Sequence, residues 1–138
     1  MINLGDDITI ATNLRQRAYA PYSHYTVGAC LQTKNGKRYS GCNIENGGIQ
    51  SICAERVAFA KAIAEGEKYF DKIVIIGGKE GNLPERTLPC GYCRQFMSEF
   101  VDKDFKIYIV YENKVEEYSI EELLPYSFKI EKKIWICK

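Results

Sequence analysis

Residues 53–78 read CAERVAFAKAIAEGEKYFDKIVIIGG, and this stretch combines two patterns that together favour an α/β fold. From Ala54 to about Glu65 it consists mostly of residues with a strong preference for helix. It then becomes a short run rich in Ile and Val that is bounded by glycine, which is typical of a strand buried on both faces. The stretch therefore predicts a helix that leads into an interior strand.

The same order of helix and strand repeats downstream. A helix is predicted from Pro89 to about Phe100, and another interior strand follows from Phe105 to Tyr111. Strands that alternate with helices need crossover connections, so at least part of the sheet is expected to be parallel. A short helix from Ile120 to Leu124, capped by Ser119, is expected near the end of the chain.

Upstream, the sequence indicates an antiparallel hairpin. Asn35-Gly36 lies between two strand-like runs, residues 25–31 and 37–42, and Asn-Gly in that position is a strong hairpin signal.

A first helix is predicted before the hairpin. Asp6 or Asp7 is expected to cap it, and apolar residues at roughly helical spacing continue it to about Ala20, where Pro21 ends it.

Length and composition limit the class of protein. At 138 residues, with 46% hydrophobic and 27% charged residues, the chain is expected to form a single domain over residues 1–138. The most economical architecture is a three-layer α/β/α domain with a mixed five-stranded sheet.

Charge and hydropathy bear on partners and location. The net charge of +1 predicts no electrostatic surface for nucleic acid. No apolar run approaches the ~20 residues of a membrane span, and the N-terminus lacks the basic-then-apolar order of a signal peptide. We therefore expect a cytoplasmic protein that binds neither nucleic acid nor membrane.

Three of the six cysteines predict a catalytic zinc site. In the cytoplasm, cysteines favour metal binding or catalysis over disulfides. Cys53, Cys90 and Cys93 would supply three thiolates, and a tetrahedral zinc ion with three protein ligands keeps one position open for water. Glu55, two residues after the first ligand, would supply the acid/base group.

Helix termini explain why these sulfurs are expected to be ionised. Ser51 is a good N-cap for the helix after Cys53, and Pro89 suits the first turn of the next helix. A helix N-terminus favours thiolate over thiol. Arg56 and Arg94 are expected to offset the net negative charge of zinc with three thiolates.

One geometric condition follows from the spacing of Cys53 and Glu55. Positions two apart in mid-helix point roughly 200° away from each other, so the helix has to begin close to Cys53 for both side chains to serve one site.

Two other interpretations remain open. Cys90-Gly91-Tyr92-Cys93 has the spacing of a redox dithiol, although that interpretation leaves Cys53 and Glu55 without a role. A structural zinc site, in a scaffold or binding module, needs a fourth protein ligand, for which the candidates are Cys30, Cys42 and His24.

The remaining cysteines have simpler interpretations. Cys30 and Cys42 fall in predicted strands and are expected to be small buried hydrophobic residues, and Cys137 has no assigned role.

The two cysteine motifs match the zinc-deaminase pattern of a ligand, one residue, a Glu, and then P-C-x-x-C, in its all-cysteine variant. Further stretches in the same order resemble the cytidine deaminase family, specifically its small homotetrameric nucleoside deaminases. They are Ala20-Pro21-Tyr22-Ser23-His24-Tyr25 with Val27-Gly28-Ala29, Gly41-Cys42-Asn43-Ile44-Glu45-Asn46, Arg94-Gln95, and Glu121-Glu122-Leu123-Leu124-Pro125 with Ser127-Phe128.

This resemblance implies zinc-dependent hydrolytic deamination of cytidine and deoxycytidine to uridine and deoxyuridine, with release of ammonia, in pyrimidine salvage. It assigns Asn43 and Glu45 to the ribose, and an amide and a carboxylate are suitable partners for a sugar hydroxyl. It places Tyr25 against the nucleoside.

The resemblance also implies roles at the base. Backbone near Ala54, together with Glu55, would hold the pyrimidine edge, and Glu55 would move protons from the attacking water to N3 and the leaving amine. Phe128 would stack on the base from a neighbouring subunit.

The chain departs from the family pattern at three places. The loop between Glu45 and Cys53 is one residue shorter, the stretch from Gly77 to Pro89 is longer, and Tyr92 fills a position that is usually Ala. Blasticidin S deaminase also has a shortened, glycine-containing loop, so blasticidin S or a modified cytidine is the alternative substrate. The run from Asn43 to Asn46 resembles the nucleoside enzymes and favours cytidine.

Overall fold

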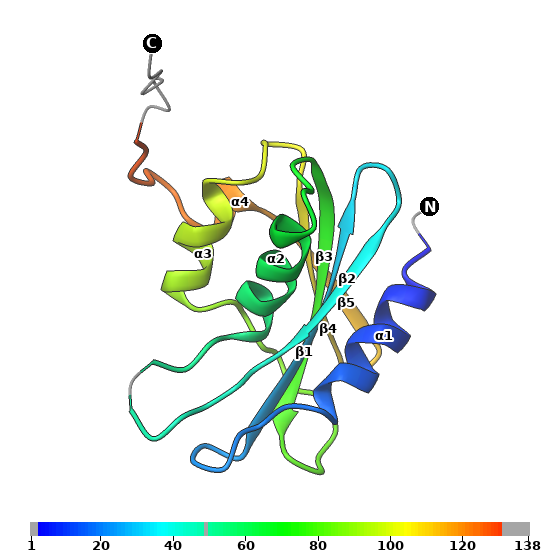
Figure 1. The fold of residues 1–138 in the computed structure, drawn as a ribbon. Coiled ribbons are helices and arrows are strands. Elements are labelled where there is room, and N and C mark those ends of the chain that lie inside the picture. The colour runs from blue at the N-terminus through cyan, green and yellow to red at the C-terminus, as the bar shows by residue number, and fades with distance from the viewer. Residues whose placement is uncertain (1–2, 49, 131–138) are drawn as a thin grey trace.

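The computed structural model describes residues 3–48 and 50–130 (Figure 1). Five of its elements are strands of one sheet, with the order β2-β1-β3-β4-β5. In chain order the elements are α1 (Gly5–Arg15), β1 (Tyr25–Thr33), β2 (Arg38–Cys42), α2 (Ala54–Ala64), β3 (Phe70–Lys79), α3 (Gly91–Ser98), β4 (Lys106–Tyr111), β5 (Lys114–Ser119) and α4 (Ile120–Leu123).

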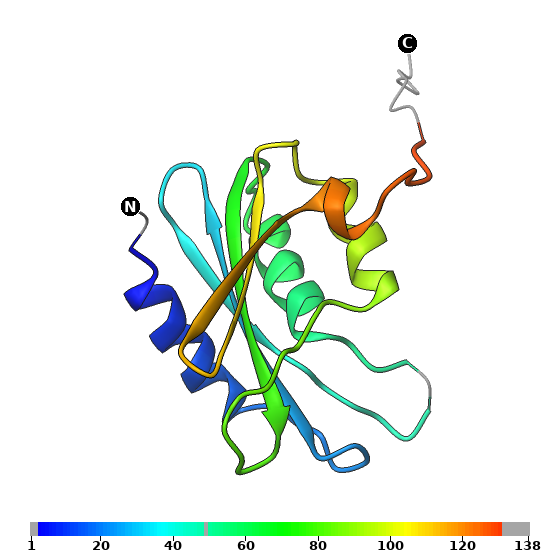
Figure 2. The same cartoon turned by 180° about the vertical axis from the view of Figure 1, so that it is seen from behind.

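Helices cover both faces of this sheet. On one face α1 packs against β1, β2 and β3, and on the other face α2 packs against β1 and β2 and contacts α3 (Figures 1 and 2). Only β3 and β4 pair in parallel, whereas the other three pairs of neighbouring strands are antiparallel. The predicted three-layer α/β/α architecture with a mixed five-stranded sheet is confirmed.

The predicted hairpin is present as β1 and β2, in antiparallel register. Its turn includes Gly36 at a φ of +91°, a left-handed conformation that glycine adopts without strain. Farther along β2, a Cβ atom built on Gly41 would lie 2.3 Å from the carbonyl oxygen of Ala54 and 2.6 Å from the nitrogen of Ala58. The glycine thus lets the first turns of α2 lie directly on the strand.

The first helix is shorter than predicted, because α1 ends at Arg15 and not near Ala20. The chain leaves the helix to pair with a later segment: the N–H of Tyr19 donates to the carbonyl of Asn43, and the N–H of Glu45 donates to the carbonyl of Tyr19. These tertiary hydrogen bonds override the local helical pattern. They also bring residues 16–24 beside the loop that follows β2.

The predicted cap of α1 was also wrong. Leu4 occupies the N-cap position, without a side-chain hydrogen bond. Asp7 lies in the first turn of the helix, almost completely buried, and its carboxylate accepts a hydrogen bond of 2.7 Å from Arg38. The carboxylate therefore ties α1 to β2. At the other end of the chain, Ser119 caps α4 as predicted.

An aromatic cluster around Phe59 fixes α2 relative to α3. The Phe59 ring lies 5.0–6.4 Å, centroid to centroid, from four other rings, and two of those belong to α3 and the turn after it. They are Phe70, Phe96, Phe100 and Phe105. Because both helices pack on this cluster, their N-terminal ends are held in a defined relation.

None of the helices formed by residues 3–48 and 50–130 combines the length and the apolar content that a membrane-spanning segment needs.

Candidate metal centre

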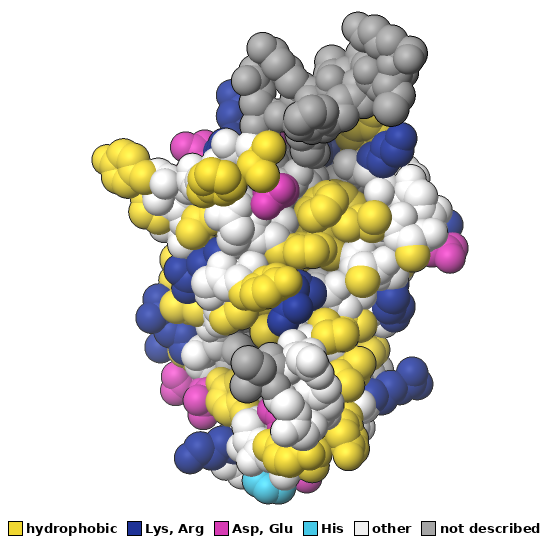
Figure 3. Space-filling model, turned by 60° about the vertical axis from the view of Figure 1, so that its left-hand side comes forward, with side chains coloured by type: hydrophobic (Ala, Val, Ile, Leu, Met, Phe, Trp, Pro, Cys, Tyr) yellow, Lys and Arg dark blue, Asp and Glu magenta, His cyan; other side chains and the backbone are white. Residues whose placement is uncertain are grey.

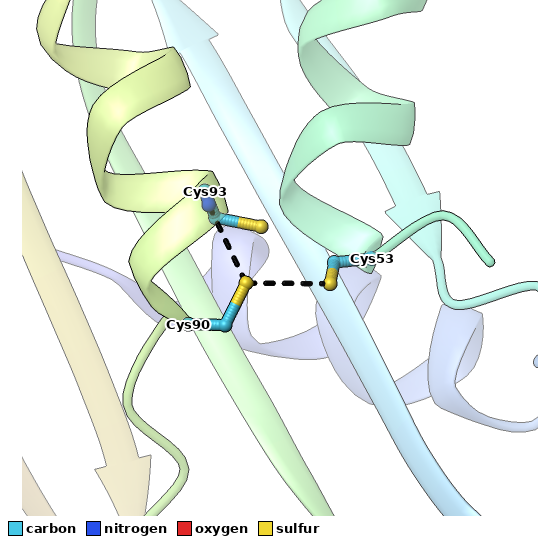
Figure 4. A group of neighbouring side chains, drawn as sticks. All are labelled: Cys53, Cys90 and Cys93. Atoms are coloured by element: carbon cyan, nitrogen blue, oxygen red, sulfur yellow. Dashed lines mark hydrogen bonds between the residues drawn. The ribbon is translucent and has the colours of Figure 1, made fainter. Parts of the chain in front are cut away.

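The three predicted ligands lie at the beginnings of two neighbouring helices. Cys53 is the N-cap residue of α2, Cys90 is the N-cap residue of α3, and Cys93 lies in the first turn of α3. The expectation that Ser51 caps α2 was wrong, because the helix begins one residue after Cys53. In Figure 4 the three side chains point toward one another from the two helices.

The spacing of the sulfurs fits a zinc ion. All three Sγ atoms lie within 4.8 Å of one another, and those of Cys53 and Cys90 are 3.7 Å apart. A tetrahedral ion with Zn–S bonds of about 2.3 Å separates its sulfurs by about 3.8 Å. The donor set is preformed, and Cys53, Cys90 and Cys93 are the residues that would hold the metal.

Electrostatics at this centre favour thiolate. The hydrogen bond from Cys93, with the hydrogen bond and charge of Arg56, lowers the pKa of Cys53 to about 5. The pKa of Cys93 is correspondingly raised, because its thiol supplies that hydrogen bond and is buried. These opposite shifts favour the negative charge on Cys53 over Cys93, so metal binding by both sulfurs has to displace the proton of Cys93.

Arg56 takes the predicted place beside the ligands. Its Nη2 atom lies 3.7 Å from the Sγ of Cys53 and donates to the carbonyl oxygen of Ser51 at 3.1 Å. Arg94 does not fulfil the same expectation: its guanidinium donates to the carbonyl oxygens of Pro89 and Leu123, at 2.7 Å and 2.8 Å. Arg94 thus links the start of α3 to the end of α4.

Glu55 is buried beside the sulfurs. Only 4% of its surface is exposed, although a carboxylate on an amphipathic helix is ordinarily solvated. Burial, together with the negative charge of Cys53, raises the pKa of Glu55 to about 7. Because α2 begins at Ala54, Glu55 lies in the first turn, which satisfies the condition that the sequence spacing imposed.

The candidates for a fourth protein ligand lie elsewhere. Cys30 is buried and donates to Asp7 beneath α1, and His24 is exposed near Glu80. Cys42, which is half-buried, is likewise absent from the cluster, whereas Cys137 lies outside the described residues. Among residues 3–48 and 50–130, the candidate metal group contains Cys53, Cys90 and Cys93 alone, which favours a catalytic site over a structural one.

The residues expected at the sugar lie on the segment after β2. The amide of Asn43 bridges β1 backbone, since Nδ2 donates to the carbonyl of Tyr25 at 2.8 Å and Oδ1 accepts from the N–H of Val27 at 2.9 Å. The carboxylate of Glu45 accepts from the N–H groups of Tyr22 and Ser23, at 3.0 Å and 3.1 Å, and from the Ser23 hydroxyl. These bonds, with the hydroxyl as the largest influence, hold the pKa of Glu45 below its usual value.

The two predicted aromatic contacts differ in their surroundings. The hydroxyl of Tyr25 lies 2.6 Å from the hydroxyl of Thr87 and donates to the carboxylate of Glu85 at 3.2 Å, so it holds the loop after β3. Phe128 is 68% exposed, and its carbonyl oxygen accepts from Gln95 of α3 at 3.2 Å. No base-binding role for either ring follows from these contacts within one chain.

Three contacts were not predicted from the sequence. They involve Ser23 with Glu45, Thr87 with Tyr25, and the ring of Tyr92 with the guanidinium of Arg56. Of these residues, only Tyr92 could have been singled out from the sequence, because it fills a position that is usually Ala in the family it resembles.

Comparison with known proteins agrees with this geometry. A family model described as "Cytidine and deoxycytidylate deaminase zinc-binding region" matches residues 6–109. The cytidine deaminase of Sporosarcina psychrophila is 39% identical over 119 residues, which is 85% of each chain. The probable cytidine deaminase of Dictyostelium discoideum is 42% identical over 127 residues, 90% of this chain and 82% of that one.

A solved structure and a more distant relative complete the comparison. The crystal structure of cytidine deaminase from Burkholderia pseudomallei superposes with a TM-score of 0.82 at 36% identity, covering 92% of this chain and all of that one. Blasticidin-S deaminase of Bacillus cereus is 32% identical over 126 residues, 88% of this chain and 89% of that one.

Proposed function

The chain belongs to the cytidine and deoxycytidylate deaminase family, and on that premise we propose that it is a zinc-dependent cytidine deaminase. The reaction is hydrolytic: cytidine or deoxycytidine and water give uridine or deoxyuridine and ammonia. The observation that carries this proposal is the group of three sulfurs within 4.8 Å of one another beside the buried carboxyl of Glu55.

The chemistry divides between the metal and Glu55. Cys53, Cys90 and Cys93 would hold the zinc ion, which would supply the Lewis acidity that lets water lose a proton near neutral pH. A carboxyl with a pKa of about 7 is suited to accept that proton at neutral pH and to return it. Glu55 first moves one proton from the attacking water to N3 as the new C4–O bond forms. It then moves the second proton, from the hydroxyl now on C4, to the amine, so that the C4–N bond breaks with loss of ammonia and the C4 carbonyl remains.

The chain around the metal centre offers groups that fit a nucleoside. The N–H of Ala54, at the first position of α2, is among those that a helix leaves without an intrahelical partner, so it suits the edge of the pyrimidine. Glu45 and the amide of Asn43 suit the ribose hydroxyls. Tyr25, whose backbone carbonyl is bound by Asn43, is proposed to flank the sugar.

We propose further that four copies of the chain assemble and share active sites, with Phe128 of one subunit stacking on the base bound by another. Two features support this assembly. Phe128 is 68% exposed, and hydrophobic side chains gather on the face that carries α3 and the loop after β2 (Figure 3). A cytoplasmic location stays a prediction from the sequence.

A substrate screen with a catalytic-residue variant tests the proposed activity. The wild-type protein with one zinc per chain is expected to deaminate cytidine and deoxycytidine, followed as loss of cytosine absorbance. Glu55→Gln should retain zinc and lose about 10³-fold in kcat, since it keeps the shape of the side chain but cannot accept a proton. Glu65→Gln, an exposed position at the other end of α2, is the matched control and should retain full activity.

Two outcomes of that screen would change the assignment. Deamination of blasticidin S without deamination of cytidine would favour the alternative substrate class. Absence of activity on cytidine, deoxycytidine, free cytosine and blasticidin S by fully zinc-loaded protein would contradict the enzyme proposal and favour a zinc-binding module.

A further inference from the structure

Tyr92 occupies an unusual place for a large aromatic side chain. It lies in the first turn of α3, between the ligands Cys90 and Cys93, and 66% of its surface is exposed. Its side chain is therefore not part of the hydrophobic core, and its contacts have to explain what it does there.

The ring of Tyr92 covers the guanidinium of Arg56. The Cζ atom of Arg56 lies 4.1 Å from the centroid of the ring, well inside the range of about 6 Å for a cation–π contact. Arg56 belongs to α2, so this contact joins the two helices that carry the metal ligands. Tyr92 thus acts across the site and not only within its own helix.

The same guanidinium also contacts the metal centre. Its Nη2 atom lies 3.7 Å from the Sγ of Cys53 and donates to the carbonyl of Ser51 at 3.1 Å. The Nε atom is buried and, among the described residues, has no hydrogen-bond partner. Arg56 thus contacts the sulfurs of Cys53 and Cys93 and one backbone carbonyl, and the Tyr92 ring adds a contact with the face of the same guanidinium.

The charge at the centre makes the position of Arg56 important. A zinc ion with three thiolates carries a net charge of about −1, and an adjacent guanidinium offsets it. The offset weakens when water reaches the guanidinium, because solvent screens charge–charge interactions. An aromatic ring over the open face of Arg56 excludes water from that face.

We propose that Tyr92 is a positioning residue for zinc retention: its ring holds the Arg56 guanidinium against Cys53, and so slows the release of zinc from the three thiolates. The proposal rests on the zinc site of the proposed function, but it does not depend on which substrate is deaminated. It predicts that the effect of Tyr92 passes through Arg56.

The test measures zinc release from the purified, fully loaded protein into excess chelator. Tyr92→Ala is expected to release zinc about three- to tenfold faster than wild type, as befits loss of one partly exposed cation–π contact. Tyr92→Phe keeps the aromatic face and should release zinc at the wild-type rate. Tyr69→Ala removes a similarly exposed tyrosine that lies after the C-terminal end of α2, and is the control for loss of an aromatic side chain.

A double-mutant cycle separates this mechanism from a general loosening of α3. Arg56→Gln alone should accelerate release by about tenfold or more, since it removes the partner of the ligand sulfur. In that background, Tyr92→Ala should produce no further acceleration. Far-UV circular dichroism confirms that each variant is folded.

The outcomes distinguish this inference from the proposed function. Equal acceleration by Tyr92→Ala with and without Arg56 would overturn the proposal, as would faster release from Tyr92→Phe or unchanged release from Tyr92→Ala. None of these results bears on cytidine deamination, which the Glu55→Gln experiment tests separately.

Discussion

Glu45 shows how a single carboxylate is prepared for a ligand. A carboxylate offers about four acceptor positions, and in Glu45 three are used by the N–H groups of Tyr22 and Ser23 and by the Ser23 hydroxyl. One position is left for a hydroxyl of the proposed substrate. The same three bonds keep Glu45 ionised, because they hold its pKa below the usual value.

Removing the Ser23 hydroxyl should therefore weaken sugar binding and leave the chemical step intact. For Ser23→Ala we expect the KM for cytidine to rise about three- to tenfold, with kcat within about twofold of wild type. Ser40→Ala is the control. It removes a hydroxyl on β2 that accepts a hydrogen bond from Lys61, and it should leave KM unchanged. An unchanged KM in Ser23→Ala, or an equal loss in kcat, would contradict the role given to Glu45.

Among the elements, the contact of α2 with β2 determines where Cys53 and Glu55 lie. A Cβ atom on Gly41 would come within 2.3 Å of the carbonyl oxygen of Ala54, and backbone at that distance has to move. The atoms that would move belong to the first turn of α2, directly beside the ligand sulfur. The close approach at Gly41 is thus a condition for the geometry of the metal centre.

Gly41→Ala should destabilise the fold and weaken zinc binding together. Overpacking of this kind costs about 1–3 kcal/mol, which corresponds to a fall of roughly 3–10 °C in Tm for a chain of this size. Differential scanning calorimetry gives the fall in Tm, and competition with a chelator gives the zinc affinity. Gly48→Ala, where the nearest atom lies 3.6 Å away at the end of a side chain, should change neither. A wild-type Tm for Gly41→Ala would contradict the close approach of α2 to Gly41.

The same elements show what the sequence could predict and what it could not. Periodicity and turn chemistry predicted the hairpin, β3 and the body of α2, though not the residue that caps it, because those signals are local. They failed at the end of α1, where Tyr19 pairs with the backbone of Asn43 and Glu45, and at Asp7, which is buried against Arg38. Those interactions join residues at least 24 positions apart, so no local pattern contains them.

At the metal centre, too, the sequence predicted some features and missed others. Residue type and spacing identified Cys53, Glu55, Cys90 and Cys93 as a candidate site, because zinc chemistry restricts the side chains that can serve. The burial of Glu55 depends on the packing of α2 and was not predicted.

At the scale of the whole molecule, the proposed assembly makes the active site a property of two chains. We expect analytical ultracentrifugation to give the mass of four chains of 15.8 kDa each. Phe128→Ala should lose about tenfold in activity, and Glu55→Gln nearly all of it. In a mixed assembly of the two variants, about a quarter of the sites regain both groups, since half of the chains keep Glu55 and half of their neighbours keep Phe128.

Recovery of activity on mixing would support sites shared between subunits. A mixture of Glu55→Gln with Cys53→Ser is the control and should stay inactive, because both residues belong to the same chain's metal centre. A monomeric mass, or activity of the first mixture no higher than the average of the two separate variants, would contradict the assembly.

The order of the ligands along the chain has a consequence for biosynthesis. Cys53 and Cys90 are 37 residues apart in the chain, and β3 lies between the two helices that carry them. A ribosome-bound chain that has emerged only as far as β3 presents one of the three sulfurs of the metal centre, that of Cys53. The complete set of three sulfurs therefore exists only once translation has passed α3, and zinc can be held by all three of them only from that point on.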